Sequence, residues 1–121
     1  MGQVTEPVFL EVSEVLELHE KSLKSFGGSP GVRDQGLLEG AVMQARQDYY
    51  YGNVDLCGIA AAYAYHIAEV QAFLDGNKRT AVSAALVFLE MHGIETRYDW
   101  KTLHKRTAPG GHPRPARTAF S

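Results

Sequence analysis

Apolar side chains recur at helical spacing in two segments of the first half of the chain. In the first they are Val15, Leu16, Leu18, Leu23 and Phe26. Ser13 is a good N-cap for this helix, and Gly27-Gly28 is a typical end. The second segment starts after Asp34, another good N-cap, and its inner face is Leu38, Ala41, Val42 and Ala45. The pattern therefore predicts two amphipathic helices separated by a turn.

The second half of the chain contains two longer alanine-rich apolar segments. Asp55 is the expected cap of a helix over residues 56–70, whose small side chains would let it approach other helices closely. Residues 81–91 are apolar nearly all round, which indicates burial on most sides. His92-Gly93 is the expected end of that helix. We expect residues 56–70 to form the central helix.

The remaining segments have weaker patterns. Residues 8–10 are a short apolar run, either a brief strand or an anchor for the first helix, and residues 94–98 alternate as a short strand does. Residues 48–53 contain three consecutive tyrosines, so we expect a break in the second helix there. Those tyrosines either pack in a loop or form a rim that touches a partner or substrate. The predicted fold class is all-α, a compact bundle with at most one or two short strands.

Composition indicates one small globular domain of 121 residues. Residues 1–100 carry 14 acidic and 7 basic side chains, a balance of −7, whereas residues 101–121 carry 5 basic and none acidic. The acidic body disfavours general binding of nucleic acid. Residues 107–121 have three prolines and no apolar period, so we expect a domain over 1–106 and an atypical, disordered, truncated or frameshifted tail.

Cysteine and hydropathy bear on the cellular compartment. The single cysteine, Cys57, lies in an apolar stretch, where we expect a buried, inert thiol. No apolar run has the length of a membrane span, and the N-terminus lacks a signal-peptide pattern. We therefore expect a cytoplasmic protein without a membrane partner.

The segment Phe73-Leu-Asp-Gly-Asn-Lys-Arg-Thr80 concentrates polar chemistry between the two apolar segments. We expect Asn77 to cap the following helix, which places Lys78 and Arg79 in its first turn. Cations are unfavourable at that end of a helix, but a bound anion would satisfy both the helix dipole and the two cations. Asp75 could hold a divalent metal against the same anion. The alternative is a capped helix with two solvated cations.

Residues 73–79 resemble the motif of the Fic/Doc family, His-x-Phe-x-Asp-Gly-Asn, and Lys78-Arg79 resembles its Doc branch, the death-on-curing toxins. Residues 27–34 and Leu38 are similar to that branch's early loop and second helix, and residues 86–93 to the helix after the motif. The resemblance covers about residues 8–100 and implies the Fic helical core. Ser13 with Glu17 is an incomplete match to the inhibitory motif that many Fic proteins carry, since Leu18 follows.

The resemblance also implies roles for individual residues. Gly76, Asn77, Lys78 and Arg79 would bind the phosphates of ATP, and Asp75 would hold Mg²⁺ between them. Lys78 and Arg79 would also offset charge in the transition state, and Phe73 would anchor the loop in the core. Doc-type relatives transfer a phosphoryl group to a translation elongation factor, whereas Fic proteins mostly transfer a nucleotidyl group such as AMP.

One catalytic position departs from the family pattern. The motif histidine, which serves as general base, should stand at residue 71, where this chain has Gln71. An amide does not accept a proton near pH 7. His66 lies about 140° away around the preceding helix, so we do not expect it to substitute. Gln71 is compatible with natural decay and with an engineered change made to permit expression.

Two functions follow from the resemblance. The first is a Doc-type kinase of a toxin–antitoxin module that is weakened or inactive through Gln71; a nucleotidyl transferase is its variant. The second is a catalytically dead module that keeps its partner surface. In both, we expect an antitoxin whose C-terminal helix docks in a groove, and nucleic acid enters only through that antitoxin.

Overall fold

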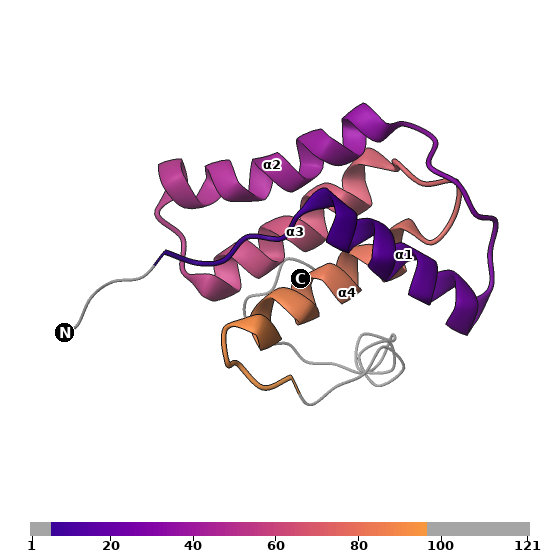
Figure 1. Ribbon diagram of the computed structural model, residues 1–121. Coiled ribbons are helices and arrows are strands. Elements are labelled where there is room, and N and C mark those ends of the chain that lie inside the picture. Colours follow the sequence, from indigo (N-terminus) through magenta and orange to yellow (C-terminus); the bar gives the residue numbers. More distant parts are fainter. Residues whose placement is uncertain (1–5, 97–121) are drawn as a thin grey trace, which may run out of the picture.

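Four α-helices organise the protein, whose computed structural model describes residues 6–96 (Figure 1). They are α1 (Val12–Phe26), α2 (Gln35–Gly52), α3 (Leu56–Val70) and α4 (Asn77–Met91). Within residues 6–96 there is no β-strand, and the expected all-α fold is confirmed. The strand expected at 94–98 is absent from 94–96. Its remaining residues, the end of the expected domain and the tail at 107–121 lie outside the described residues.

Helix α3 is central, as its small residues predicted. It packs against α2 on one side and α4 on the other, while α1 lies against α4 (Figure 1). Ile59, Tyr63 and Ile67 of α3 are fully buried, and the Tyr63 ring lies 5.5 Å from the ring of Phe88 on α4. The core is therefore built mainly on the two helices that flank the polar segment.

The segment before α1 is an anchor rather than a strand. Leu10 is buried, and its backbone N–H donates a hydrogen bond of 2.8 Å to the hydroxyl of Tyr63. This bond satisfies a buried backbone donor and a buried phenol together. It fixes the start of α1 against the central helix.

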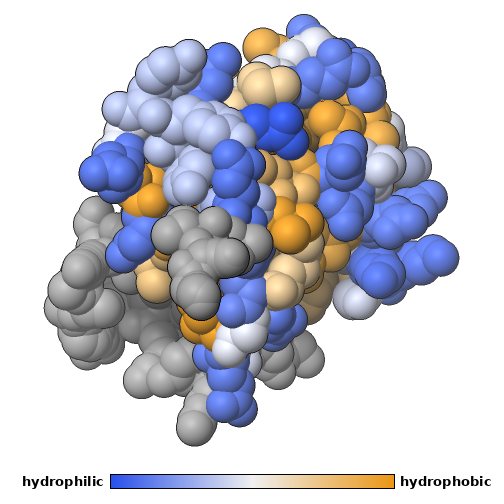
Figure 2. Space-filling view, turned by 60° about the vertical axis from the view of Figure 1, so that its left-hand side comes forward, coloured by the Kyte–Doolittle hydropathy of each residue, from blue (hydrophilic) through white to orange (hydrophobic). Residues whose placement is uncertain are grey.

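Helix α4 is buried over most of its length, as its composition predicted. Its buried residues are Thr80, Ala81, Val82, Ala84, Ala85 and Phe88. Apolar surface nevertheless reaches solvent elsewhere, and Figure 2 shows it lying between hydrophilic residues on one face. No helix within residues 6–96 combines the length and apolar character needed to cross a bilayer.

The predicted N-caps of α2 and α3 are confirmed, whereas that of α1 is wrong. Asp34 accepts a hydrogen bond from the N–H of Leu37 at 3.0 Å, and Asp55 accepts one from Gly58 at 2.8 Å. Helix α1 instead begins after Glu11, not Ser13. The Glu14 carboxylate accepts a 2.7 Å bond from the Glu11 N–H, which moves the start of the helix two residues earlier.

The expected helix break at the three tyrosines is wrong, because α2 continues to Gly52. Tyr49 packs its ring edge-on against Phe9 at 5.7 Å, whereas Tyr50 donates a hydrogen bond to Glu6. Tyr51 is 87% exposed. The Tyr49 and Tyr50 rings also pack on each other, with centroids 5.1 Å apart, and both contact Phe9, so α2 carries the three tyrosines without a break.

The expectation of a buried Cys57 is also wrong, because its side chain is exposed. Cys57 lies in the first turn of α3, where Asp55 sets the register. That register turns Ile59 and Ala60 toward the core and leaves Cys57 outside.

Candidate functional site

The polar segment forms a short loop between α3 and α4, bounded by two residues with positive φ. Gln71 ends α3 with φ 53° and ψ 47°, and Gly76 precedes α4 with φ 78°. A left-handed backbone at each end turns the chain sharply. The loop is thereby confined between the ends of two packed helices.

Backbone hydrogen bonds fix this loop to the connection between α1 and α2. Val32 and Phe73 form an antiparallel bridge, and the Leu74 N–H donates to the Gly31 carbonyl at 3.1 Å. The N–H groups of Arg33 and Asp34 both donate to the carbonyl of Ala72, at 2.6 and 3.1 Å. The loop conformation therefore depends on a segment that is distant in sequence.

Phe73 anchors the loop in the core, as the resemblance implied. It is 2% exposed, and its ring stacks on His19 of α1 with centroids 3.8 Å apart and planes inclined by 11°. The Nε2 atom of His19 donates to the carbonyl of Asp75 at 2.8 Å, because a carbonyl can only accept. His19 is distant from the loop in sequence, so no spacing signal links the two.

Asn77 does not cap α4, so that expectation is wrong. The N-cap is Gly76, and Asn77 is the first helical residue. Its side chain turns back to the loop, where Oδ1 accepts from the Phe73 N–H at 3.0 Å and Nδ2 donates to the Phe73 carbonyl at 2.9 Å. Within the described part of the chain, the first N–H groups of α4 have no protein acceptor, since the first bonded one is Thr80.

Asp75 is an exposed carboxylate held by two backbone donors. Its Oδ2 accepts from the Ser29 N–H at 3.1 Å and its Oδ1 from the Gly76 N–H at 2.9 Å. The hydrogen bond from Ser29, followed by that from Gly76, lowers the pKa of Asp75 below its usual range. The side chain is therefore ionised at neutral pH, and each oxygen keeps a lone pair for another contact.

Close packing around Asp75 and Gly76 restricts the neighbouring positions. A Cβ atom on Gly28 would lie 2.9 Å from Oδ2 of Asp75. A Cβ on Gly76 would lie 3.3 Å from Nη2 of Arg79. Glycine at both positions therefore allows the carboxylate and the guanidinium to lie close to the backbone.

Lys78 and Arg79 occupy the first turn of α4, as expected. Lys78 is exposed, whereas Arg79 is half-buried, donates to the Gly27 carbonyl at 3.0 Å and lies 5.3 Å above the ring of Phe26. Two cations therefore sit beside the positive end of the helix dipole, where an anion would be stabilised.

The donor set fits magnesium only together with a phosphate. No group of three or more histidine, cysteine or acidic side chains that could hold a metal occurs within residues 6–96. Mg²⁺ commonly uses one or two carboxylates and completes its shell with phosphate oxygens and water. Asp75 alone, beside an anion-binding helix end, matches that requirement.

Gln71 lies at the opposite end of the loop from Asp75. Its Nε2 donates to the carbonyl of Ala68 at 2.9 Å, and its own carbonyl accepts from Arg33 Nε at 2.9 Å. The neutral amide of Gln71 is thus bonded to the backbone of its own helix. His66 is bonded to Asp48 of α2 at 3.0 Å, away from the loop, as its rotation around the helix predicted.

Comparison with known proteins identifies the family. The family model described as Fic/DOC family matches residues 9–89. "Protein kinase doc" of Escherichia phage P1 is 34% identical over 83 residues, which cover 68% of this chain and 66% of that protein. "Toxin Doc" of Mycolicibacterium smegmatis (strain ATCC 700084 / mc(2)155) is 41% identical over 80 residues, 63% of this chain and 60% of that protein. The chain thus spans less than two thirds of the length of each relative. Because the family model matches residues 9–89, the chain belongs to the Fic/DOC family.

Proposed function

We propose that this chain is a Doc-type domain of a toxin–antitoxin module that binds Mg²⁺ and ATP at residues 75–79. The observation that carries the proposal is the ionised Asp75 beside unpaired N–H groups of α4, with Lys78 and Arg79 in the same turn. The printed names of the relatives, a protein kinase and a toxin, support this assignment. The acceptor would be a protein hydroxyl, with a translation elongation factor as the candidate target.

Each side chain has a definable part in phosphoryl transfer. Mg·ATP would supply the phosphoryl group. The N–H groups of α4 would bind its oxygens, Asp75 would hold the metal, and the two cations would offset charge that grows in the transition state. Gln71 offers no base to take the proton from the attacking hydroxyl. We therefore propose slow transfer or none, with nucleotide binding retained.

Nucleotide binding is tested by calorimetry on the folded chain. Arg79→Ala should weaken Mg·ATP binding by roughly 1.5–3 kcal/mol, because it removes a charge-assisted contact. Lys24→Ala, which removes an exposed cation from α1, is the matched control and should bind normally. If the native chain binds no ATP at millimolar concentration, the proposed site is wrong.

The proposed lack of a general base at residue 71 is tested by placing a histidine there. Gln71→His should raise transfer of label from γ-labelled ATP to lysate protein by about 10²–10⁴-fold, the usual contribution of a positioned base. Gln71→His combined with Asp75→Asn is the control and should be inactive. Label from α-labelled ATP would instead indicate nucleotidyl transfer.

A catalytically dead binding module is the second candidate, and one observation favours it. The Gln71 amide bonds the Ala68 carbonyl, so its donor is directed at the backbone of its own helix. If Gln71→His remains inactive while the chain still binds an antitoxin, the binding module is the better description.

A hollow between α1 and α4, lined by apolar and polar side chains, is the candidate antitoxin surface. Its apolar lining consists of Leu18, Phe26, Leu86 and Val87, around a volume of about 300 Å³. Such a surface suits the apolar face of an amphipathic helix. We propose that the C-terminal helix of the antitoxin docks there and restrains the domain in trans.

A further inference from the structure

A larger cavity, of about 600 Å³, lies between α2 and α3 and shares no residue with the motif loop. The last turns of α2 form one wall, and residues 58–66 of α3 form the other. On α3 the lining residues Gly58, Ala61 and Ala62 are small, which leaves the space open. This cavity has no part in the function proposed above.

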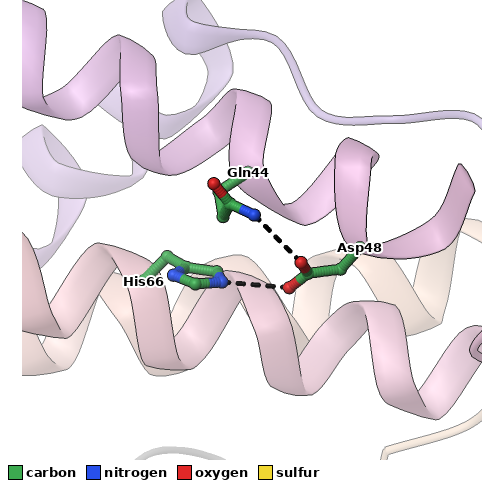
Figure 3. A network of polar contacts seen from close by, with 3 residues as sticks. All are labelled: Gln44, Asp48 and His66. Atoms are coloured by element: carbon green, nitrogen blue, oxygen red, sulfur yellow. Dashed lines mark hydrogen bonds and ion pairs between the residues drawn. The ribbon is translucent and has the colours of Figure 1, made fainter. Parts of the chain in front are cut away.

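One carboxylate dominates the polar side of this cavity. Asp48 on α2 accepts a 3.0 Å hydrogen bond from Gln44 at one oxygen and a 3.0 Å bond from His66 of α3 at the other (Figure 3). Each oxygen still has a lone pair that can accept another donor. The Asp48 side chain is 34% exposed, so a ligand can reach it.

The lining carries one acidic residue, Asp48, and neither lysine nor arginine. His66, which is bonded to Asp48, is the one lining side chain that can become positively charged. Burial alone would raise the pKa of Asp48, but the bonds from Gln44 and His66 and the charge of His66 lower it overall. The carboxylate is therefore ionised at neutral pH and has unused capacity to bind a positive group.

Two aromatic side chains complete the lining. Tyr51 is 87% exposed and Tyr65 is 53% exposed, and both border the cavity. The faces of tyrosine rings attract cations, and exposed tyrosines are enriched in protein interfaces. A small ligand that fills only the cavity would leave the Tyr51 ring in water. A polypeptide that inserts one side chain into the cavity could also cover this ring with its neighbouring residues.

We infer that this cavity receives an arginine or lysine side chain of a partner polypeptide, with its cationic head on Asp48 and its flanking residues on Tyr51 and Tyr65. The excess of acidic over basic side chains in residues 1–100 favours approach of a basic partner. This surface is separate from the hollow between α1 and α4.

The inference is tested by NMR titration of the full ¹⁵N-labelled chain. The probe is acetyl-Gly-Arg-Gly-amide, and its neutral isostere with citrulline in place of arginine is the control. We expect saturable shift changes at the amides of Gly52, Gly58 and Ala61 with the arginine peptide alone. Asp48→Asn should weaken the binding about tenfold, because it removes a hydrogen bond to a charged group.

Two further variants separate the cavity from general acidity and from misfolding. Glu20→Gln removes an exposed acidic charge from α1 and should leave the affinity unchanged. Tyr51→Ala should weaken binding without affecting folding, since this side chain is already exposed. The inference is overturned if both peptides bind alike, if Asp48→Asn and Tyr51→Ala bind normally, or if the shifts map elsewhere. It is also overturned if methylguanidinium binds as tightly as the arginine peptide.

Discussion

Gly76 joins the motif loop to α4 through a backbone conformation that other residues rarely adopt, with φ 78°. A Cβ there would also lie 3.3 Å from Nη2 of Arg79 and within 3.7 Å of the His19 ring. The single residue therefore links the path of the backbone to the position of Arg79, the cation proposed to bind phosphate.

Gly76→Ala is predicted to lower the free energy of unfolding by about 1–2 kcal/mol, the usual cost of a left-handed conformation outside glycine. Gly40→Ala is the matched control. It lies inside α2 with no atom within 4 Å of its added Cβ, and should stabilise the protein by about 0.5–1 kcal/mol. Urea denaturation of the two variants measures both effects. Equal stability of the two would show that the left-handed backbone carries no cost here.

At the scale of elements, the pair Asp48 and His66 connects α2 to the central α3 across a cavity. Hydrogen bonds from Gln44 and His66 outweigh burial and lower the pKa of Asp48 in the folded state. A carboxyl group whose pKa is lower in the folded state than in the unfolded state stabilises the fold. This stabilisation is fully present when the pH is above the unfolded-state pKa, and it is lost as the pH falls through the folded-state pKa.

The native chain should therefore lose stability between about pH 5 and the depressed pKa of Asp48, where the unfolded state takes up more protons. Asp48→Asn should show a shallower decline over the same window, because its amide does not titrate. Urea unfolding at several pH values measures the two slopes. Parallel declines would mean that Asp48 does not contribute to acid sensitivity.

Local sequence signals predicted those elements whose determinants are local. The aspartates at 34 and 55 cap α2 and α3 as expected, and the apolar period places the right residues of α3 and α4 in the core. Prediction from local sequence failed where a tertiary contact competed with the local preference. Asn77 bonds to Phe73 instead of capping, and Tyr49 and Tyr50 both pack against Phe9. The sequence identified the motif residues, but not the stacking of His19, which comes from a different helix.

At the scale of the whole molecule, the motif loop and the hollow between α1 and α4 are neighbouring surfaces on one bundle, because Phe26 lines the hollow and its ring contacts Arg79. The apolar side chains of the hollow come from both helices and lie among polar ones. A partner helix bound there would gain most of its affinity from apolar burial, independently of residue 71.

We therefore predict that the antitoxin binds the native chain and Gln71→His with equal affinity, and with a large negative heat-capacity change. Leu86→Gln should weaken binding, because it replaces an apolar side chain of the hollow with an amide. Co-expression with the product of the neighbouring reading frame, followed by size-exclusion chromatography and calorimetry, measures these effects. If that product never co-elutes with the native chain, trans restraint by this neighbour is wrong.

The bridge between Val32 and Phe73 has a consequence for the order of folding. The α3–α4 pair can form from contacts near in sequence, but the backbone hydrogen bonds between the loop and residues 31–34 form only when that distant segment arrives. Closing such a long loop costs chain entropy before its contacts are gained. Pulsed hydrogen exchange should thus find amides within α3 and α4 protected before the N–H of Leu74. A nascent domain would have its helical framework before it had the proposed phosphate site.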